Sequence, residues 1–391
     1  MKEYKRLGDY IREVNVRNRE LEVTNLLGVS ISKEFMPSIA NTIGTDMSTY
    51  KIVKRGQFAY GPVTSRNGDK VSIALLSKYN DAIISQAYTV FEIINHEQLL
   101  PEYLMMWFRR PEFDRYARFH SHGSAREVFD WDELCDVKLP IPSIERQREI
   151  VAEYETLTRR IHLNEQIIQH LESTAQALYR KMFVDGIDKE NLPEGWRIRT
   201  LGEVCSKIGS GATPKGGKDS YTNGGVSFIR SMNIFDFSFC YDELAHISDK
   251  QAKSLDSVIV KERDILFNIT GASATRCCMV PNNVLPARVN QHVMIIRSKE
   301  HIMSYFLLCL LSSDESKRSL LGMSQSGSTR EAITKSEIES FRIIKPPKDL
   351  LKEYDSCTKI IFSQIDLYIQ ENSKLTNLQS LLLRRWGNNV M

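Results

Sequence analysis

Short loops rich in glycine, serine, asparagine and basic residues are the parts of this 391-residue chain whose residue types could do chemistry. Their lysines and arginines can neutralise phosphates, and arginine, asparagine, glutamine and serine can hydrogen-bond to base edges in the major groove of DNA. The segment 209–218 combines several glycines, which allow close approach of the backbone, with two lysines. We predict that such loops contact double-stranded DNA through Ser30, Lys33, Arg66, Gln86, His122, Ser124, Arg126, Lys215, Lys218, Arg230, Asn233, Arg276, Gln291, Ser328 and Arg330.

Catalytic motifs fail at their key positions. Gly211 and Gly216 have P-loop spacing, but Gly217 stands where the lysine is required, and Pro214 breaks the dinucleotide-binding pattern. The chain lacks the Asn-Pro-Pro-Tyr or Asp-Pro-Pro-Tyr tetrapeptide with which amino-methyltransferases hold their target base. The pair Cys277-Cys278 and the pair His120/His122 lack further ligands at metal-binding spacing. We therefore expect a non-enzymatic reader that binds no metal and no cofactor of its own.

An internal repeat organises the chain. Gly-Ser-Ala-Arg-Glu at 123–127 returns as Gly-Ser-Thr-Arg-Glu at 327–331, a displacement of 204 residues. The same displacement pairs Pro142 with Pro346 and Leu171 with Leu375 in one ungapped register, which indicates a duplication. Arg126 and Arg330 are the strongest contact candidates because both copies hold them, although each arginine could instead tie its loop to the following helix.

Each half ends in a long helical pattern. From Glu145 to about Met182 there is no glycine or proline, and seam residues alternate at intervals of four and three, which is a heptad pattern. Asn164 stands within the first seam, and Thr358, Asn372 and Gln379 interrupt the second. We expect the helices to pack antiparallel through Ile150, Tyr154, Leu157, Ile161, Ile168, Leu171, Leu178, Tyr354, Ile361, Ile365, Tyr368, Leu375 and Leu382. The alternative is that each helix packs only into its own globular core.

Both globular parts show the pattern of short strands between turns. Apolar runs at 57–60, 71–76 and 88–94 predict strands in the first half, and runs at 226–230, 264–270 and 292–297 predict strands in the second. An amphipathic helix follows in each copy, at 101–110 and 302–311. Ser85-Gln86 and Asn290-Gln291 precede corresponding strands, but the N-terminal portion of the two copies is otherwise diverged.

Composition sets outer limits on function. A net charge of +3 is a weak basic excess, so DNA would be read in local patches and not bound by overall charge. No apolar run is long enough to span a bilayer, the N-terminus has no signal-peptide core, and seven irregularly spaced cysteines suit a reducing compartment. We therefore expect a cytoplasmic protein with no membrane partner.

The order of these features resembles a known family. A Leu-Gly start, a diverged domain, a Gly-Ser-x-Arg-Glu loop, a strand ending in proline, a long helix and a Leu-Pro-Glu-Gly-Trp linker at 192–196, followed by a second round, resembles the specificity (S) subunit of type I restriction–modification enzymes. The resemblance implies an α+β fold, with two mixed α/β target-recognition domains in tandem joined by two long antiparallel coiled-coil helices with pseudo-two-fold symmetry. The implied domains are 1–142, a spacer helix 143–184, a linker 185–196, a second domain 197–346 and a second helix 347–391.

The resemblance also implies partners. Each domain would read one half of an asymmetric bipartite site, and the helices would set the spacing and dock two methyltransferase (M) subunits that carry S-adenosylmethionine. Restriction (R) subunits using ATP and Mg²⁺ would join the complex. About 38 helical residues span roughly 57 Å, or on the order of 17 base pairs of B-DNA.

Two other classes of function remain open. One is an enzyme fragment or a nuclease with an unfamiliar site, which activity of the purified chain would reveal. The other is a coiled-coil scaffold whose globular domains bind protein, which salt-dependent and sequence-selective binding to duplex DNA would exclude.

Overall fold

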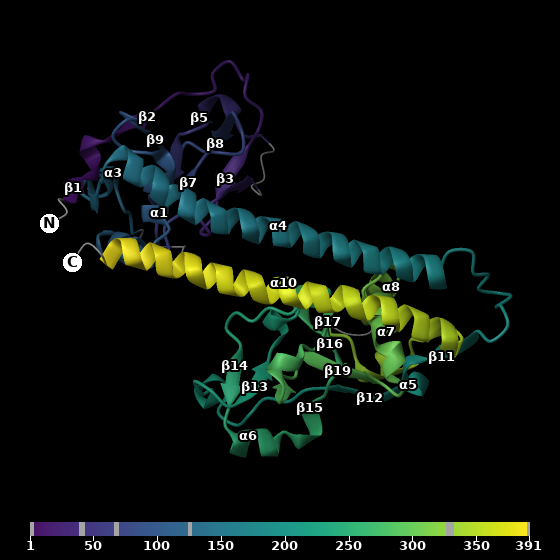
Figure 1. Ribbon diagram of the computed structural model, residues 1–391. Helices are drawn as coiled ribbons and strands as arrows, with labels where there is room; N and C mark the ends of the chain where they lie inside the picture. Colours follow the sequence, from purple (N-terminus) through teal and green to yellow (C-terminus); the bar gives the residue numbers. More distant parts are fainter. Residues whose placement is uncertain (1–3, 39–43, 66–69, 124–126, 326–331, 389–391) are drawn as a thin grey trace. The chain divides into compact units, whose positions relative to one another are not determined.

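A computed structural model describes residues 4–38, 44–65, 70–123, 127–325 and 332–388. The chain divides into two compact units, one formed by 1–160 with 375–391 and the other by 161–374. Each unit therefore takes one globular domain together with one part of each long helix. The long helices are α4 (Ile144–Phe183) and α10 (Lys348–Asn388) (Figure 1).

The first unit is built around a four-stranded antiparallel sheet in the order β2-β9-β6-β7. Its strands are β2 (Ile11–Val14), β6 (Phe58–Tyr60), β7 (Ile73–Leu75) and β9 (Thr89–Ile93). Three antiparallel pairs accompany it: β1 (Tyr4–Arg6) with β10 (Lys138–Pro140), β3 (Leu27–Val29) with β4 (Phe35–Pro37), and β5 (Lys51–Lys54) with β8 (Asp81–Ile84). The short helices are α1 (Pro101–Phe108), α2 (Pro111–Phe119) and α3 (Trp131–Cys135).

The second unit repeats this plan. Its sheet β12-β19-β16-β17 contains β12 (Cys205–Ser210), β16 (Ile265–Asn268), β17 (Cys277–Met279) and β19 (Val293–Ser298). A second sheet, β14-β13-β18-β15, contains β13 (Val226–Ile229), β14 (Ala245–Ile247), β15 (Ile259–Val260) and β18 (Ala287–Val289). Strand β11 (Arg197–Thr200) pairs with β20 (Arg342–Lys345), and the helices are α5 (Leu201–Val204), α6 (Asp249–Ser254), α7 (Ser304–Leu311), α8 (Asp314–Gln325) and α9 (Lys335–Ser340).

The duplication extends into the part of the sequence that looks diverged. In the second unit β13 pairs with β18 in parallel, and β18 pairs with β15 antiparallel. In the first unit the same order is made by β3, β8 and β5, where a single parallel bridge, Leu26 to Ile83, replaces the longer parallel pairing. The two units therefore share one strand topology although their N-terminal sequences have drifted.

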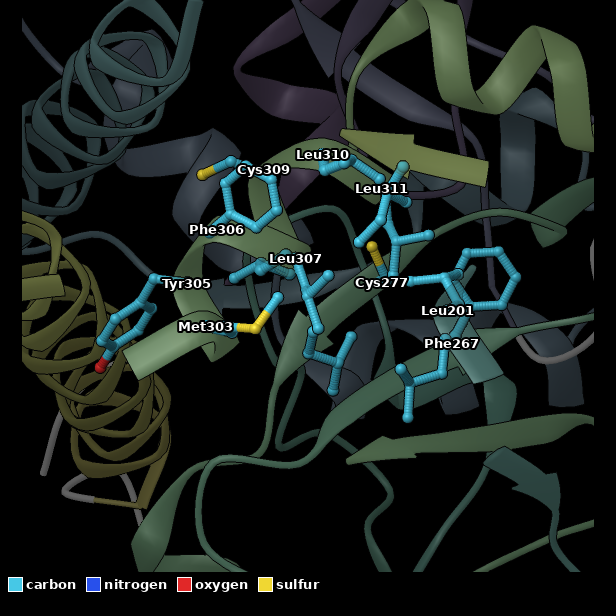
Figure 2. Packing of buried hydrophobic residues seen from close by; sticks show 14 of the residues in the cluster. Leu201, Phe267, Cys277, Met303, Tyr305, Phe306, Leu307, Cys309, Leu310 and Leu311 are labelled. Atoms are coloured by element: carbon cyan, nitrogen blue, oxygen red, sulfur yellow. The ribbon is translucent and has the colours of Figure 1, made fainter. Parts of the chain in front are cut away.

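Apolar helices close each core. All eight residues of α7 are buried, and Phe306, Leu307 and Leu311 pack with Phe267 of β16 and Cys277 of β17 (Figure 2). In the first unit, six of the eight residues of α1 are buried, and five of them belong to the core cluster that contains the aromatic residues of the sheet. Burial of such side chains stabilises each unit by roughly 1.5–3 kcal/mol per large residue before entropy is counted.

The two long helices run antiparallel within each unit. In the second unit the side chain of Asn164 contacts Asn372, whereas Phe183 near the end of α4 packs on Tyr354 near the start of α10. In the first unit Gln379 bonds to Thr158, and Leu383 belongs to the core cluster that contains Ile150. None of the thirteen residues predicted to form the seam is exposed, and four of them are buried: Ile150, Tyr154, Tyr354 and Ile365.

The polar positions of the second seam are accommodated by hydrogen bonds. Thr358 donates to the backbone carbonyl of Tyr354 on its own helix, at 2.6 Å. Asn372 and Gln379 each bond to α4, so the helix packs despite its polar seam. None of the helices in the described segments is long and apolar enough to cross a membrane.

Candidate nucleic-acid interface

In the second unit, the predicted contact loops leave one end of the β12-β19-β16-β17 sheet. Strand β12 ends at Ser210 opposite Met294, and β16 ends at Asn268 opposite Val293. Strand β17 begins at Cys277, opposite Phe267. The segments 211–218, 269–276 and 290–292 therefore emerge together from the strand ends.

A close backbone approach fixes the glycine-rich loop. The N–H of Gly211 donates to the carbonyl of Val293 at 2.9 Å, and the N–H of Ala212 donates to that of Val289 at 3.1 Å. A Cβ atom on Gly211 would lie 2.1 Å from the Val289 oxygen, so glycine is required here. The loop then carries Lys215 and Lys218, both exposed, away from the sheet.

The turn before β19 holds the predicted base-reading amide. The hydroxyl of Thr213 donates to the side-chain oxygen of Gln291, whose amide lies 3.1 Å from Nε2 of His292. His292 is held in turn by a 2.9 Å hydrogen bond between its Nδ1 and the hydroxyl of Thr270. Gln291 is exposed but has a defined position, which is the arrangement that direct readout of a base requires.

Two arginines border the same strand ends. Arg230 follows β13, where the N–H of Asn290 donates to the carbonyl of Ile229 at 3.0 Å. The Arg230 guanidinium donates to the carbonyl of Glu243 and lies 5.7 Å from the centre of the Tyr221 ring. Arg276 lies over Phe235 at 5.2 Å. Both side chains are half-buried, so they can present only part of their donors outward.

The residues that directly follow the Gly-Ser-x-Arg-Glu motif of the second unit lie at this end of the sheet. Thr270 forms a β-bridge with Ala332, and the N–H of Ile333 donates to the carbonyl of Ile269 at 2.9 Å. Ser328 and Arg330 themselves lie outside the described residues.

The first unit has the corresponding arrangement. Strand β6 ends at Tyr60 opposite both Thr89 and Ile73, so the segments 61–72 and 85–88 leave the same sheet end. Val63 forms a bridge with Val128, as Thr270 does with Ala332. Gln86 and His122 are exposed there, and Ser30 is half-exposed beside its partner Ser32. Arg66, Ser124 and Arg126 lie outside the described residues.

Two predicted contacts have to be corrected. Lys33 is buried, donates to the carbonyl of Phe108 and forms an ion pair with Asp114 at 2.8 Å, and burial lowers the pKa of its amine. Asn233 is completely buried, and its amide donates to the carbonyls of Cys240 and Asp242. Both side chains stabilise their own loops, so neither is available to DNA. Polarity in a loop, the signal used for the prediction, does not distinguish these two roles.

A groove in the second unit could not be predicted from any motif in the sequence. It has a volume of about 450 Å³ and lies between α4 and the segments around Asp236 and Arg276, lined by Glu165, Ile168, Gln169, Glu172, Phe235, Asp236, Ser238, Arg276 and Ile369. Burial, and then the charge of Asp236, raises the pKa of Glu172 to about 7. Asp236 forms an ion pair with Lys317 at 2.6 Å. No cluster of side chains in the described segments could hold a metal ion.

Comparison with known proteins agrees with the repeated architecture. Residues 32–173 and 193–380 match the family described as Type I restriction modification DNA specificity domain. The MjaIX specificity subunit of Methanocaldococcus jannaschii is 26% identical over 70% of this chain and 65% of that protein, so the chain spans slightly less than two thirds of that relative. The HindI specificity subunit of Haemophilus influenzae is 20% identical and matches over 98% of both chains.

A solved structure shares the fold. The crystal structure of the type I restriction–modification S subunit from M. genitalium aligns with 98% of this chain and 95% of that chain, at a TM-score of 0.59 and 12% identity. The duplicated strand topology, the paired long helices and the two matched segments lead to one assignment. The chain belongs to the type I restriction–modification DNA specificity family and is a DNA-recognition subunit.

Proposed function

We propose that each unit reads one half of an asymmetric bipartite DNA site through the loops at its sheet end. The observation that carries this proposal is that both units gather polar loops at the same end of an equivalent sheet, and that these loops share one glutamine (Gln86 and Gln291) but otherwise differ, as with His122 in the first unit and Lys215 in the second. Equivalent positions with different side chains lead to two different half-sites. The lysines would mainly neutralise phosphates, and the amides would read base edges.

The helices α4 and α10 would set the spacing and dock two methyltransferase subunits. Leu163 and Leu367 support this part of the proposal, because they are exposed by 45% and 57% and lie 204 residues apart, the displacement of the repeat. One repeated apolar position on each helix suits two copies of the same partner. S-adenosylmethionine would then be bound by those subunits, and ATP and Mg²⁺ by restriction subunits that join the complex.

The primary test is co-expression with candidate methyltransferase subunits, followed by single-molecule sequencing of host DNA for methyladenine. A split, asymmetric methylated motif that disappears when this chain is omitted is the expected result. Exchange of residues 197–346 should then change one half of the motif only. If methylation is identical without this chain, the chain does not set specificity, and the scaffold alternative takes precedence.

Docking can be tested separately. Leu163→Asp and Leu367→Asp should each remove one methyltransferase subunit from the complex, and the double variant should remove both, as read by native mass spectrometry. Leu381→Asp is the matched control, because Leu381 is equally exposed on α10 but the repeat places Ala177 at its counterpart. Retention of two subunits by the double variant would exclude this docking site.

A further inference from the structure

Phe119 is the most exposed large hydrophobic side chain among the described residues, at 81%. It is the last residue of α2, a helix otherwise fastened to the core through Phe113 and Ala117. A single exposed phenylalanine is ordinary on a protein surface. Its position relative to the neighbouring groups therefore decides whether it can contact a partner.

The position of Phe119 is tied to the proposed DNA-facing end of the first unit. Two residues further on, Ser121 accepts a hydrogen bond from Thr64 at 3.0 Å and donates to the carbonyl of Ala117 at 2.6 Å. Thr64 belongs to the loop after β6, and its N–H donates to the carbonyl of Glu127 at 2.9 Å. The end of α2 is therefore bonded to the same loops that carry the predicted contacts.

The ring is also supported from behind. Phe119 meets His120 edge to face, with 5.2 Å between ring centres, and His120 stacks on Tyr116 at 4.2 Å. The Nδ1 of His120 lies 2.9 Å from a carboxylate oxygen of Glu133, which fixes the imidazole. A ring backed by stacked and bonded neighbours loses little conformational entropy when it inserts into a partner.

Basic residues precede and follow Phe119 in the sequence, with Arg115 and His122 beside the carboxylates of Glu112 and Glu133. Arg115 and His122 have side chains that are mostly exposed, and Arg118 is half-exposed while paired with Glu127. Aromatic rings interleaved with cations are the arrangement that stacks on bases and neutralises the flanking phosphates. The hydrogen bonds that tie this end of α2 to the loop after β6, which is proposed to face DNA, favour DNA over a protein partner as the occupant.

We infer that Phe119 inserts into or stacks on a base step of the half-site read by the first unit. This inference rests on the proposed function. It adds a side chain that responds to the deformability of the DNA, whereas the polar loop residues read the donor–acceptor pattern of the bases. The wedge would unstack one step and so lower the cost of distorting the duplex near the base to be methylated.

The test uses the full chain in complex with its methyltransferase subunits and a duplex that carries the motif found by methylation mapping. Phe119→Ala should weaken binding by about tenfold or more, and Phe119→Leu by less, because leucine can still wedge. Ile94→Ala is the matched control, since Ile94 is also exposed but follows β9 at the opposite end of the same sheet. The control should bind within twofold of the unchanged chain.

A second measurement separates wedging from a structural role. With 2-aminopurine placed in turn at each position of the first unit's half-site, the unchanged complex should show enhanced emission at one step, and Phe119→Ala should abolish that signal. Unchanged emission and affinity in Phe119→Ala would overturn the inference, as would loss of methyltransferase subunits from the variant complex, which would make Phe119 a protein contact. Failure of the unchanged complex to bind any motif would instead overturn the proposed function.

Discussion

Asn164 of α4 is completely buried and donates a hydrogen bond from its side-chain amide to the side-chain oxygen of Asn372 on α10, at 2.8 Å. The same amide donates to Glu371 at 3.0 Å, and the amide of Asn372 reaches the carbonyl of Ile161 at 3.4 Å. A buried polar pair in an apolar seam stabilises less than two leucines would, but its hydrogen bonds between the helices can form in only one register.

Replacing one partner of this pair should be costlier than replacing both. We expect Asn164→Leu to lower the free energy of unfolding by about 1–3 kcal/mol, because the half-buried Asn372 oxygen then loses its donor. The double variant Asn164→Leu/Asn372→Leu should recover most of that loss. Thermal unfolding monitored by circular dichroism measures both, with Thr358→Val as the control that removes a buried hydroxyl bonded only within α10. A double variant as unstable as the single one would contradict this account.

The groove beside α4 should make stability depend on pH. An unfolded glutamate loses its proton near its ordinary pKa of 4.5, whereas Glu172 in the folded chain keeps it until about pH 7. The folded state therefore binds more protons between these values, so stability should fall as pH rises from 4.5 to 7 and then level off. Allowing for partial exposure, the loss should be about 1–2 kcal/mol.

Glu172→Gln should remove this pH dependence and raise the melting temperature at pH 8. Glu155→Gln, an exposed carboxylate on the same helix, provides the comparison and should leave the pH profile unchanged. Identical profiles for Glu172→Gln and the unchanged chain would show that the carboxyl group does not titrate in this range.

Gly211→Ala should disturb the second unit's recognition loop, because the added Cβ would collide with the Val289 carbonyl. The displaced loop should weaken binding to the half-site read by residues 197–346. We therefore expect methylation of the motif to fall by tenfold or more if two phosphate contacts are lost. Gly209→Ala is the control two residues earlier, where a Cβ would meet no atom within 4 Å. Equal methylation by the two variants would mean that the loop takes no part in recognition.

A strained backbone supports the ion pair between the second unit's sheet and α10. Arg263 has a φ of +62° and donates to Asp355 at 2.6 Å and to the carbonyl of His301 at 3.0 Å. Gly56 has a φ of +86° at the matching place before β6, where no large side chain is needed. Arg263→Gly would relieve about 1 kcal/mol of strain but leave Asp355, which is mostly buried, without its partner.

The net result for Arg263→Gly should be destabilisation by about 1–3 kcal/mol, measured by thermal unfolding. Arg199→Ala breaks an exposed ion pair with Glu203 and should cost less than about 1 kcal/mol. If Arg263→Gly is as stable as the unchanged chain, the strain and the ion pair cancel.

The hydrophobic periodicity of the sequence predicted the long helix and the strands whose formation depends on that pattern. The helix expected from Glu145 to Met182 is α4, the run at 57–60 contains β6, and the run at 292–297 overlaps β19. The equivalence of β3-β8 with β13-β18 could not be predicted, because strand pairing depends on contacts between residues far apart in sequence and here on one parallel bridge. Burial of Lys33 against Asp114 is likewise a tertiary effect that loop composition does not encode.

The pairing of β1 with β10, and of β11 with β20, has an evolutionary consequence. Because the first and last strands of each globular domain are hydrogen-bonded neighbours, the chain enters and leaves the domain at one place. A contiguous gene segment between those strands can therefore be replaced by another of the same kind, with the following helix left in place. Recombination at the paired strands would generate new combinations of half-sites in single steps, without the slow refinement of individual contacts.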